Sequence, residues 1–499
     1  MANAPSSDTA FFGHPRGLST LFFTEMWERF SYYGMRALLL LYVTAPAAAG
    51  GLGFSAAEGG AIYALYTSMA YMAALPGGWI ADRLIGPRRA VLWGGIIIAA
   101  GHFTAAIPSL PTFYLGLTLI VVGTGLLKGN VSVIVGHLYG PEDQRRDAGF
   151  SIFYMGINLG AFLAPLVCGY LGQRVSWHTG FAAAGVGMTL GVIQYAVTSR
   201  RLLGEAGLHP AAATPTETAA SWRQARLWGG LGLGAALVLG IGGATGALPI
   251  TAVGVADSAG VLLLLSTVGF FGWLFFGGGW TPAERRRLYV IGVLFFASAL
   301  FWSVFEQAGS TLNLFADRNT RTEVFGLSFP SSWFQSVNSF FIFTLAPVFA
   351  WLWLWLARRG QEPTSPAKFA WGLLLVGLGF VVLIGPARAA EAGTLASPLW
   401  LVLTYLLHTM GELSLSPVGL SAMTRLAPAR IAGLVMGVWF LGTSVGNFIG
   451  GRVGGLYESM ALPTLFGVVG AFAIVSGLVL AIFVKPMSRL TDAEPARKA

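Results

Sequence analysis

Charged residues are scarce in this 499-residue chain, because Asp, Glu, Lys and Arg together make up only 10% of it. Soluble domains carry about a quarter charged residues, so the composition excludes an ordinary soluble globular protein. Cysteine is scarcer still: Cys168 stands alone in an apolar run, which excludes an intramolecular disulfide and gives no sign of a metal site. We also expect no cleavable signal peptide, because the first apolar segment, at about 18–43, is too long and too charged for one.

Long apolar segments dominate the chain instead. Hydrophobic residues make up 55% of it, and the mean hydropathy is +0.69. A helix that crosses a bilayer needs about 20 mostly apolar residues. Fourteen segments meet this requirement, at about 18–43, 56–81, 90–107, 112–137, 148–171, 179–199, 227–247, 255–278, 288–314, 332–357, 368–386, 398–424, 431–453 and 462–484. These runs are too long for membrane strands and do not alternate with period two, so we predict an all-α polytopic membrane protein.

The basic residues lie mainly at the ends of the apolar segments. Of the 30 Lys and Arg residues, 22 fall in the termini and in one set of loops, five fall in the opposite loops, and three lie inside segments. Cytoplasmic loops of membrane proteins carry such an excess. The split therefore predicts a multi-pass protein of the cytoplasmic (inner) membrane with both termini in the cytoplasm, and the absence of a soluble basic patch argues against a nucleic-acid partner.

The order of the segments predicts the domains. A polar stretch rich in Pro, Ala and Thr follows the sixth segment, and the next two segments carry a single charge, Asp257. The predicted parts are a cytoplasmic N-terminus at 1–17, a six-helix bundle at 18–200, a linker at 201–226, an inserted pair of transmembrane helices at 227–280, a second six-helix bundle at 281–485 and a cytoplasmic tail at 486–499.

Four ionisable residues lie inside the first apolar segment: Glu25, Glu28, Arg29 and Arg36. An ionisable group at the centre of a bilayer costs about 2.5–3.5 kcal/mol on insertion scales, and such groups usually face a polar cavity. Positions 25, 28/29, 32 and 36 are three or four residues apart, so they fall on one helical face together with Tyr32. A fixed network of salt bridges between helices is the alternative, but the density of charge favours a functional site.

Three further charges lie inside apolar segments, namely Lys128, Glu306 and Glu412. We expect them to converge with the first segment on one cavity between the two bundles. Neutral polar residues at similar depth are Asn158, Asn338, Gln307, Ser310 and Ser416. Each of these could be an ordinary hydrogen bond between helices, but together they describe a wet site for a zwitterion. The cations suit its carboxylate, and Glu412 with the asparagines suits its ammonium group.

The loop at 77–89 (GGWIADRLIGPRR) matches the G-x-x-x-D-R-x-x-G-x-R-R pattern of the major facilitator superfamily. We expect Asp82 and Arg83 to belong to a cytoplasmic gate, and Arg83, Arg88 and Arg89 to stay among the lipid headgroups. Anchoring by positive charge would explain the arginines alone. It does not explain the spacing of Gly78, Asp82 and Gly86.

With these residues in hand, the chain resembles the proton-dependent oligopeptide transporter family of the major facilitator superfamily over about 15–485. The most specific piece is Glu25–Gly34, which matches the family signature ExxERFxYYG. Further matching pieces are 128–132 (KGNVS), 153–158 (FYMGIN), 301–307 (FWSVFEQ), 333–338 (WFQSVN) and 412–417 (ELSLSP). The sequence departs from the family at Gly129 and Ser339, where the family usually has proline.

The resemblance implies the major facilitator fold and a set of residue roles. In the family, the positions of Arg29, Tyr33 and Lys128 contact the carboxylate of a bound peptide. The positions of Asn158, Asn338 and Glu412 contact its amino terminus. The remaining implied roles are proton coupling for Glu25, Glu28, Arg29 and Glu306, lining of the site for Arg36 and Tyr71, shaping of pockets for Trp302 and Trp439, and a place near the cytoplasmic gate for Ser416.

The predicted function is proton-coupled symport that imports di- and tripeptides by alternating access, with the proton as coupling ion, no other cofactor and a monomer as the functional unit. Another small zwitterion, an anion such as nitrate, or a peptide-like drug stays open as the cargo, because recognition of the peptide termini sets no side-chain preference. A membrane-embedded enzyme is disfavoured, since the sequence contains no nucleophile–base set and no HExxH metal motif.

Overall fold

The structure is a computed structural model that describes residues 8–140, 143–210, 215–428 and 431–491. The predicted cytoplasmic tail beyond residue 491 and the first seven residues therefore lie outside the described part of the chain. The helices of the first half are α1 (Gly17–Thr44), α2 (Ala56–Met72), α3 (Ala74–Ile80), α4 (Pro87–Ala105), α5 (Leu110–His137), α6 (Arg146–Arg174), α7 (Trp177–Leu202) and α8 (Pro215–Ala244). Those that follow are α9 (Ala252–Phe276), α10 (Pro282–Phe305), α11 (Thr311–Arg318), α12 (Phe334–Arg358), α13 (Ser365–Val382), α14 (Ile384–Glu391), α15 (Pro398–Leu426), α16 (Ala432–Gly454) and α17 (Leu462–Thr491).

Shorter elements join these helices. They are the 3₁₀ turns η1 (Ala47–Ala49), η3 (Glu306–Gly309) and η4 (Ser331–Trp333), the π-helical turn η2 (Ala81–Ile85), and a two-residue antiparallel hairpin of β1 (Glu323–Val324) and β2 (Leu327–Ser328). All fourteen predicted segments are helical, so the all-α fold class is confirmed.

Nine helical stretches of the described residues are long and apolar enough to cross a membrane. Helix α1 is not among them, because each 18-residue stretch of it carries at least three ionisable residues. The same charges that make α1 a candidate site therefore exclude it from these nine stretches.

Proline explains two of the three predicted segments that are broken in the structure. The segment 56–81 breaks at Ala73, three residues before Pro76, and the segment 368–386 breaks at Leu383, three residues before Pro386. Proline has no N–H to bond the carbonyl four residues earlier, and its ring clashes with that carbonyl. The third broken segment, 288–314, contains no proline and passes through the 3₁₀ turn η3 at Glu306–Gly309.

Side-chain caps start several helices where the sequence changes from loop to apolar run. Thr281 and Glu284 form a complete capping box at the start of α10, with Pro282 in the first turn. Ser397 accepts a hydrogen bond from the backbone N–H of Leu399 at the start of α15. Such caps bond N–H groups that have no partner inside the helix.

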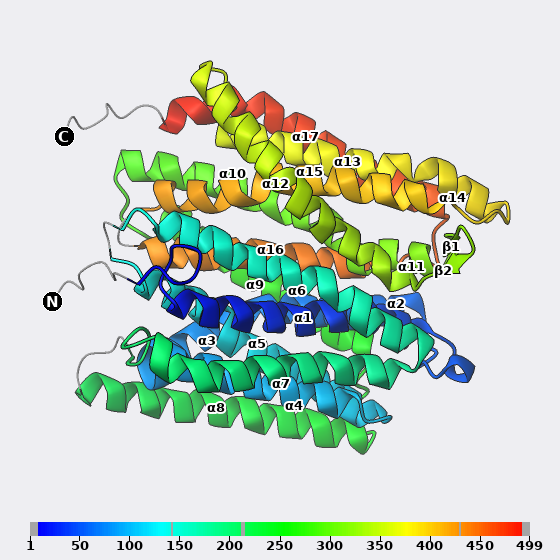
Figure 1. Cartoon of the computed structure of the whole chain (residues 1–499), viewed down its shortest axis with the longest axis horizontal. Coiled ribbons are helices and arrows are strands. Elements are labelled where there is room, and N and C mark those ends of the chain that lie inside the picture. The colour runs from blue at the N-terminus through cyan, green and yellow to red at the C-terminus, as the bar shows by residue number, and fades with distance from the viewer. Residues whose placement is uncertain (1–7, 141–142, 211–214, 429–430, 492–499) are drawn as a thin grey trace. The chain divides into compact units, whose positions relative to one another are not determined.

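The contacts divide the chain into two compact units. The first unit contains residues 1–38 and 69–255, and the second contains residues 39–68 and 256–499. In the first unit α4 lies along α5, and in the second α13 lies along α15 and α17 (Figure 1). The division follows contacts rather than order along the chain, so that the end of α1 and most of α2 cluster with the C-terminal helices. The predicted domain boundaries stay a prediction.

Glycine allows the close approach of α4 and α5. A Cβ atom built on Gly101 would lie 2.8 Å from the carbonyl oxygen of Gly116 and 2.8 Å from a side-chain carbon of Ile120. Small residues at helix contacts of this kind let backbones pack closely within a membrane.

Gly101→Leu should therefore lower the unfolding temperature in detergent, because overpacking a tight contact costs about 1–3 kcal/mol. The matched control is Gly229→Leu on α8, where a built Cβ meets nothing within 4 Å. Equal losses of stability in the two variants, measured by thermal unfolding, would contradict the close packing of α4 on α5.

Candidate functional site

Three of the four charged residues of α1 form one buried cluster in the first unit. The Arg29 Nε atom donates a hydrogen bond to the carboxylate of Glu28 and lies 3.2 Å from Glu25 Oε1. Each of the three side chains is at most 4% exposed. The guanidinium of Arg29 therefore lies between two carboxylates, one from the residue before it and one from four residues earlier, on the charged face that the sequence predicted.

Each of these three side chains also has one polar atom that makes no hydrogen bond to the described residues. Glu25 Oε2, Glu28 Oε1 and Arg29 Nη2 are buried and have no hydrogen-bond partner among the described residues. A carboxylate can take up a proton on such an oxygen, whereas a guanidinium nitrogen can only donate, for example to an anion. The cluster therefore has places for a proton and for a negatively charged ligand group.

Tyrosine rings lie next to the two cations of the site, Arg29 and Lys128. Lys128 Nζ on α5 lies 3.0 Å from the ring centroid of Tyr71 and 5.9 Å from that of Tyr32. The guanidinium carbon of Arg29 lies 5.2 Å from the centroid of the same Tyr32 ring. The ring of Tyr32 thus lies within cation–π range of both cations.

Tyr32 is absent from the predicted site residues, although its position on the charged face of α1 could have placed it there. The predicted residues Tyr33 and Arg36 form a similar pair one turn further on, with the Arg36 guanidinium carbon 5.4 Å from the Tyr33 centroid. Asn158 is buried on α6, and its amide donates to the carbonyl of Tyr154 at 3.1 Å within the same helix.

The second unit brings together the residues predicted to bind an amino terminus. The amide nitrogen of Asn338 on α12 donates to Glu412 Oε2 at 3.0 Å and to the hydroxyl of Thr409 at 2.9 Å, both on α15. A carboxylate beside an amide suits an ammonium ligand, because both offer oxygen acceptors. Sequence reasoning missed Thr409, although a polar residue three positions before Glu412 shares its helical face.

The remaining predicted residues of the second unit lie on α10, in the turn η3, and on α15 and α16. Glu306 is buried in the 3₁₀ turn that ends α10, at a break that the sequence did not predict. The ring of Trp302 packs edge-on to Phe305 at 5.3 Å, and its indole nitrogen is buried with no hydrogen-bond partner among the described residues. Ser416 is half-buried one turn after Glu412, and Trp439 is buried.

The predicted site residues thus form one set in each unit. The first set holds Glu25, Glu28, Arg29, Tyr33, Arg36, Tyr71, Lys128 and Asn158, and the second holds Trp302, Glu306, Asn338, Glu412, Ser416 and Trp439. Their convergence on one cavity stays a prediction, as do their roles.

The loop motif at 77–89 lies partly on the surface, and its place in a cytoplasmic gate stays a prediction. Asp82 and Arg83 are exposed in the π-helical turn η2, and Gly86 has the positive φ of 82° that favours glycine. The prediction that Arg88 stays among the headgroups was wrong, because its guanidinium is buried. It donates to the carbonyls of Ser199 and Gly204 at 2.8 and 2.6 Å, where α7 ends.

Long apolar helices that carry buried ionisable clusters define a multi-pass membrane transporter. Residues 88–206 and 280–469 match the model of the POT family. The chain is 41% identical over 502 residues to the peptide transporter YePEPT of Yersinia enterocolitica, covering 98% of each protein. It is 36% identical over 504 residues to a di-/tripeptide transporter of Lactococcus lactis, covering 98% of this chain and 99% of the relative.

The solved structures agree with the sequence matches. The crystal structure of a peptide transporter POT in complex with sulfate has a TM-score of 0.90 and 44% identity to this chain, covering 96% of both chains. The chain therefore belongs to the POT family, as its six motifs predicted.

Arg88→Ala should destabilise the protein by about 1–3 kcal/mol, because two carbonyls at the end of α7 lose a charged hydrogen-bond donor. The neighbouring Arg89→Ala removes the same charge from an exposed position and should leave the unfolding temperature nearly unchanged. If both variants unfold at the same temperature in detergent, the capping role of Arg88 is wrong.

Proposed function

We propose that this chain is a symporter that uses protons to import di- and tripeptides across the cytoplasmic membrane by alternating access. The observation that carries the proposal is the buried guanidinium of Arg29 between Glu25 and Glu28, with an oxygen of each carboxylate and a nitrogen of Arg29 lacking a protein partner among the described residues. Peptide transporters among the relatives support peptide as the cargo.

The cluster suggests how proton and peptide binding are linked. A buried cation is stable only when it is paired. A proton on Glu25 or Glu28 leaves Arg29 with one carboxylate fewer, so that the carboxylate of a peptide takes the vacant place. A proton that moves inward contributes about 2.3 kcal/mol per 100 mV of membrane potential. Glu306 is the proposed third group of the proton path.

The peptide is proposed to bind by its two ends. Arg29, Tyr33 and Lys128 would hold its carboxylate, and Asn338 with Glu412 and Asn158 would hold its ammonium group. The hydrogen bond between Asn338 and Glu412 supports this assignment, because it positions the carboxylate oxygen without adding a positive charge. The proposal requires the two sets to face one cavity, about which the two bundles rock.

Three further features belong to the proposal. Both termini lie in the cytoplasm, in keeping with the 22-to-5 distribution of basic residues. The protein works as a monomer, and it needs no cofactor besides the coupling proton.

Uptake of labelled di-alanine into proteoliposomes tests the function directly. We expect uptake to require an inward proton gradient and to collapse when an uncoupler is added. Competition by di- and tripeptides but not by nitrate is the expected pattern. Uptake that nitrate inhibits and peptides do not would assign another cargo to the same fold.

Glu25→Gln and Glu28→Gln should each abolish accumulation that depends on the proton gradient, because the amide cannot exchange a proton. Both variants should keep counterflow exchange of peptide, since Arg29 can still bind the peptide carboxylate. The control is Glu205→Gln, which removes an exposed carboxylate from the linker and should change neither assay. Full gradient-driven accumulation by both site variants would exclude these carboxylates from coupling.

A further inference from the structure

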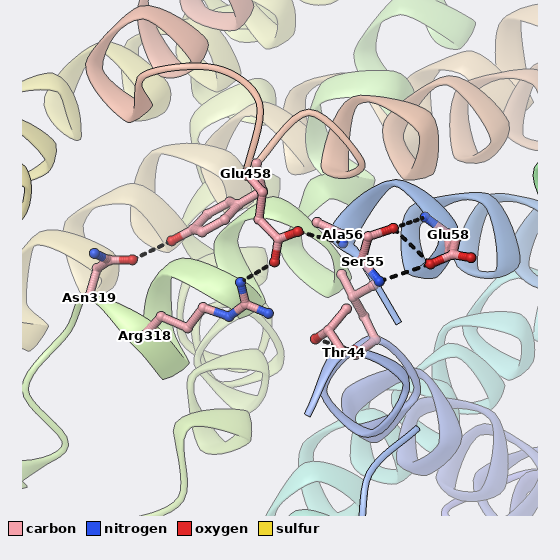
Figure 2. Close-up of polar contacts among 9 residues, drawn as sticks. Thr44, Ser55, Ala56, Glu58, Arg318, Asn319 and Glu458 are labelled. Atoms are coloured by element: carbon pink, nitrogen blue, oxygen red, sulfur yellow. Dashed lines mark hydrogen bonds and ion pairs between the residues drawn. The ribbon is translucent and has the colours of Figure 1, made fainter. Parts of the chain in front are cut away.

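The first turn of α2 is capped twice, once from its own segment and once from far along the chain (Figure 2). Ser55 and Glu58 form a reciprocal pair: the Ser55 N–H donates to Glu58 Oε2 at 3.0 Å, and the Glu58 N–H donates to Ser55 Oγ at 3.3 Å. This pair leaves the N–H of Ala56 without a partner. Glu458, in the loop after α16, accepts it through Oε2 at 2.9 Å.

The second oxygen of the same carboxylate holds another helix. Glu458 Oε1 accepts a hydrogen bond from the guanidinium of Arg318, the last residue of α11, at 2.7 Å (Figure 2). The adjacent Tyr457 hydroxyl donates to the side-chain oxygen of Asn319 at 2.5 Å. One short loop therefore ties the beginning of α2 and the end of α11 to α16, all within the second unit.

Helix α11 connects this tie to the predicted proton path. It begins at Thr311, directly after the turn that contains Glu306, and ends at Arg318. The hydroxyl of Ser310, at the joint, donates to the carbonyl of Gly450 on α16 at 3.2 Å. Arg318 and the backbone that carries Glu306 therefore lie at opposite ends of one two-turn helix.

After its first turn, α2 packs against α16 and Gly455 along a seam of small residues, which contains Gly60, Ala64, Gly451 and Gly455. A Cβ built on Gly60 would lie 2.6 Å from the backbone nitrogen of Gly455 and 2.7 Å from the carbonyl oxygen of Gly451. Further along, Ser444 donates to the carbonyl of Ser68 at 2.8 Å. Backbones at this separation leave no passage for a solute, so this seam must part if cargo is to enter here.

The tie is suited to repeated opening. The side chains of Glu458 and Arg318 are 43% and 32% exposed, and ion pairs in such positions are weak. Partial burial opposes ionisation, but the Ala56 N–H and Arg318 hold the pKa of Glu458 below its ordinary value, so the carboxylate stays charged at neutral pH. Water can replace either partner when the helices separate.

We propose that Glu458 is a positioning residue of the transport cycle, whose carboxylate latches the ends of α2 and α11 onto α16. With the proposed orientation these ends face outward, and entry of cargo from outside requires the latch to release both. The inference rests on the proposed function only in that the chain transports by alternating access, whatever its cargo is.

Thiol labelling tests the latch without any substrate. Ala64→Cys places a reporter at the seam, where Ala64 is fully buried, and Cys168→Ala removes the native thiol. In right-side-out vesicles, Glu458→Gln should raise the rate of labelling by an impermeant maleimide about fivefold, the effect expected for one exposed ion pair and one weakened cap. Arg318→Gln breaks only the bond to α11 and should raise the rate by less, and the double variant should add little to Glu458→Gln, because Arg318 acts through the same carboxylate.

The matched control is Glu58→Gln, which removes the same charge from the same helix end but breaks only the local pair. It should change the labelling rate less than twofold, roughly within the scatter of a surface substitution. A merely structural role of Glu458 predicts faster labelling from both sides of the membrane and a lower unfolding temperature. That result, or an unchanged rate in Glu458→Gln, would overturn the latch.

A disulfide tests whether the seam must part. A Cβ built on Gly455 lies 3.2 Å from the Cα of Ala57, within reach of a disulfide between Ala57→Cys and Gly455→Cys. Oxidation should abolish uptake, and a reductant should restore it, while either single variant stays active. Full uptake by the oxidised double variant would overturn the inference. If no peptide is taken up by any variant but labelling behaves as expected, the proposed cargo fails and the latch stands.

Discussion

The pairing of one buried guanidinium with two buried carboxylates is the constraint on which the site depends. Isolated ions in a low-dielectric interior cost several kcal/mol each, and only close partners offset that cost. Arg29 has two such partners within its own helix: Glu25, at the spacing of four residues that helical geometry brings together, and the adjacent Glu28. Because two negative groups share one positive group, the balance of charge changes with each proton gained or lost. This is the physical basis for linking ion and cargo.

Aromatic rings extend this balance away from α1. Tyr32 lies within cation–π range of Arg29 and Lys128, and Tyr71 covers the ammonium of Lys128 more closely. Rings stabilise a cation without neutralising it. The arrangement in the second unit is complementary, since Asn338 fixes a carboxylate by hydrogen bonding and adds no positive charge.

Sequence patterns predicted the helices and the charged face of α1, because both depend on composition and on the local period of the helix. They also predicted the family, through motifs spread over both halves. The break at Glu306, the burial of Arg88 and the contact of Glu458 with Ala56 were not predictable in this way. Each depends on which distant backbone groups lie nearby. Proline signalled the breaks near Pro76 and Pro386, but the prediction treated both segments as continuous.

Helix α8, unlike α4 and α5, is packed against few other residues of the described chain. Only 6% of its most apolar stretch is buried, and most of its described residues are exposed. Where neighbouring side chains do not constrain a position, the surrounding medium alone sets which residues are tolerated. For a helix in lipid that requirement is hydrophobicity without a particular shape. Leu, Val, Ile and Ala should therefore exchange freely along α8 during evolution, whereas the glycines that join α4 to α5 should not.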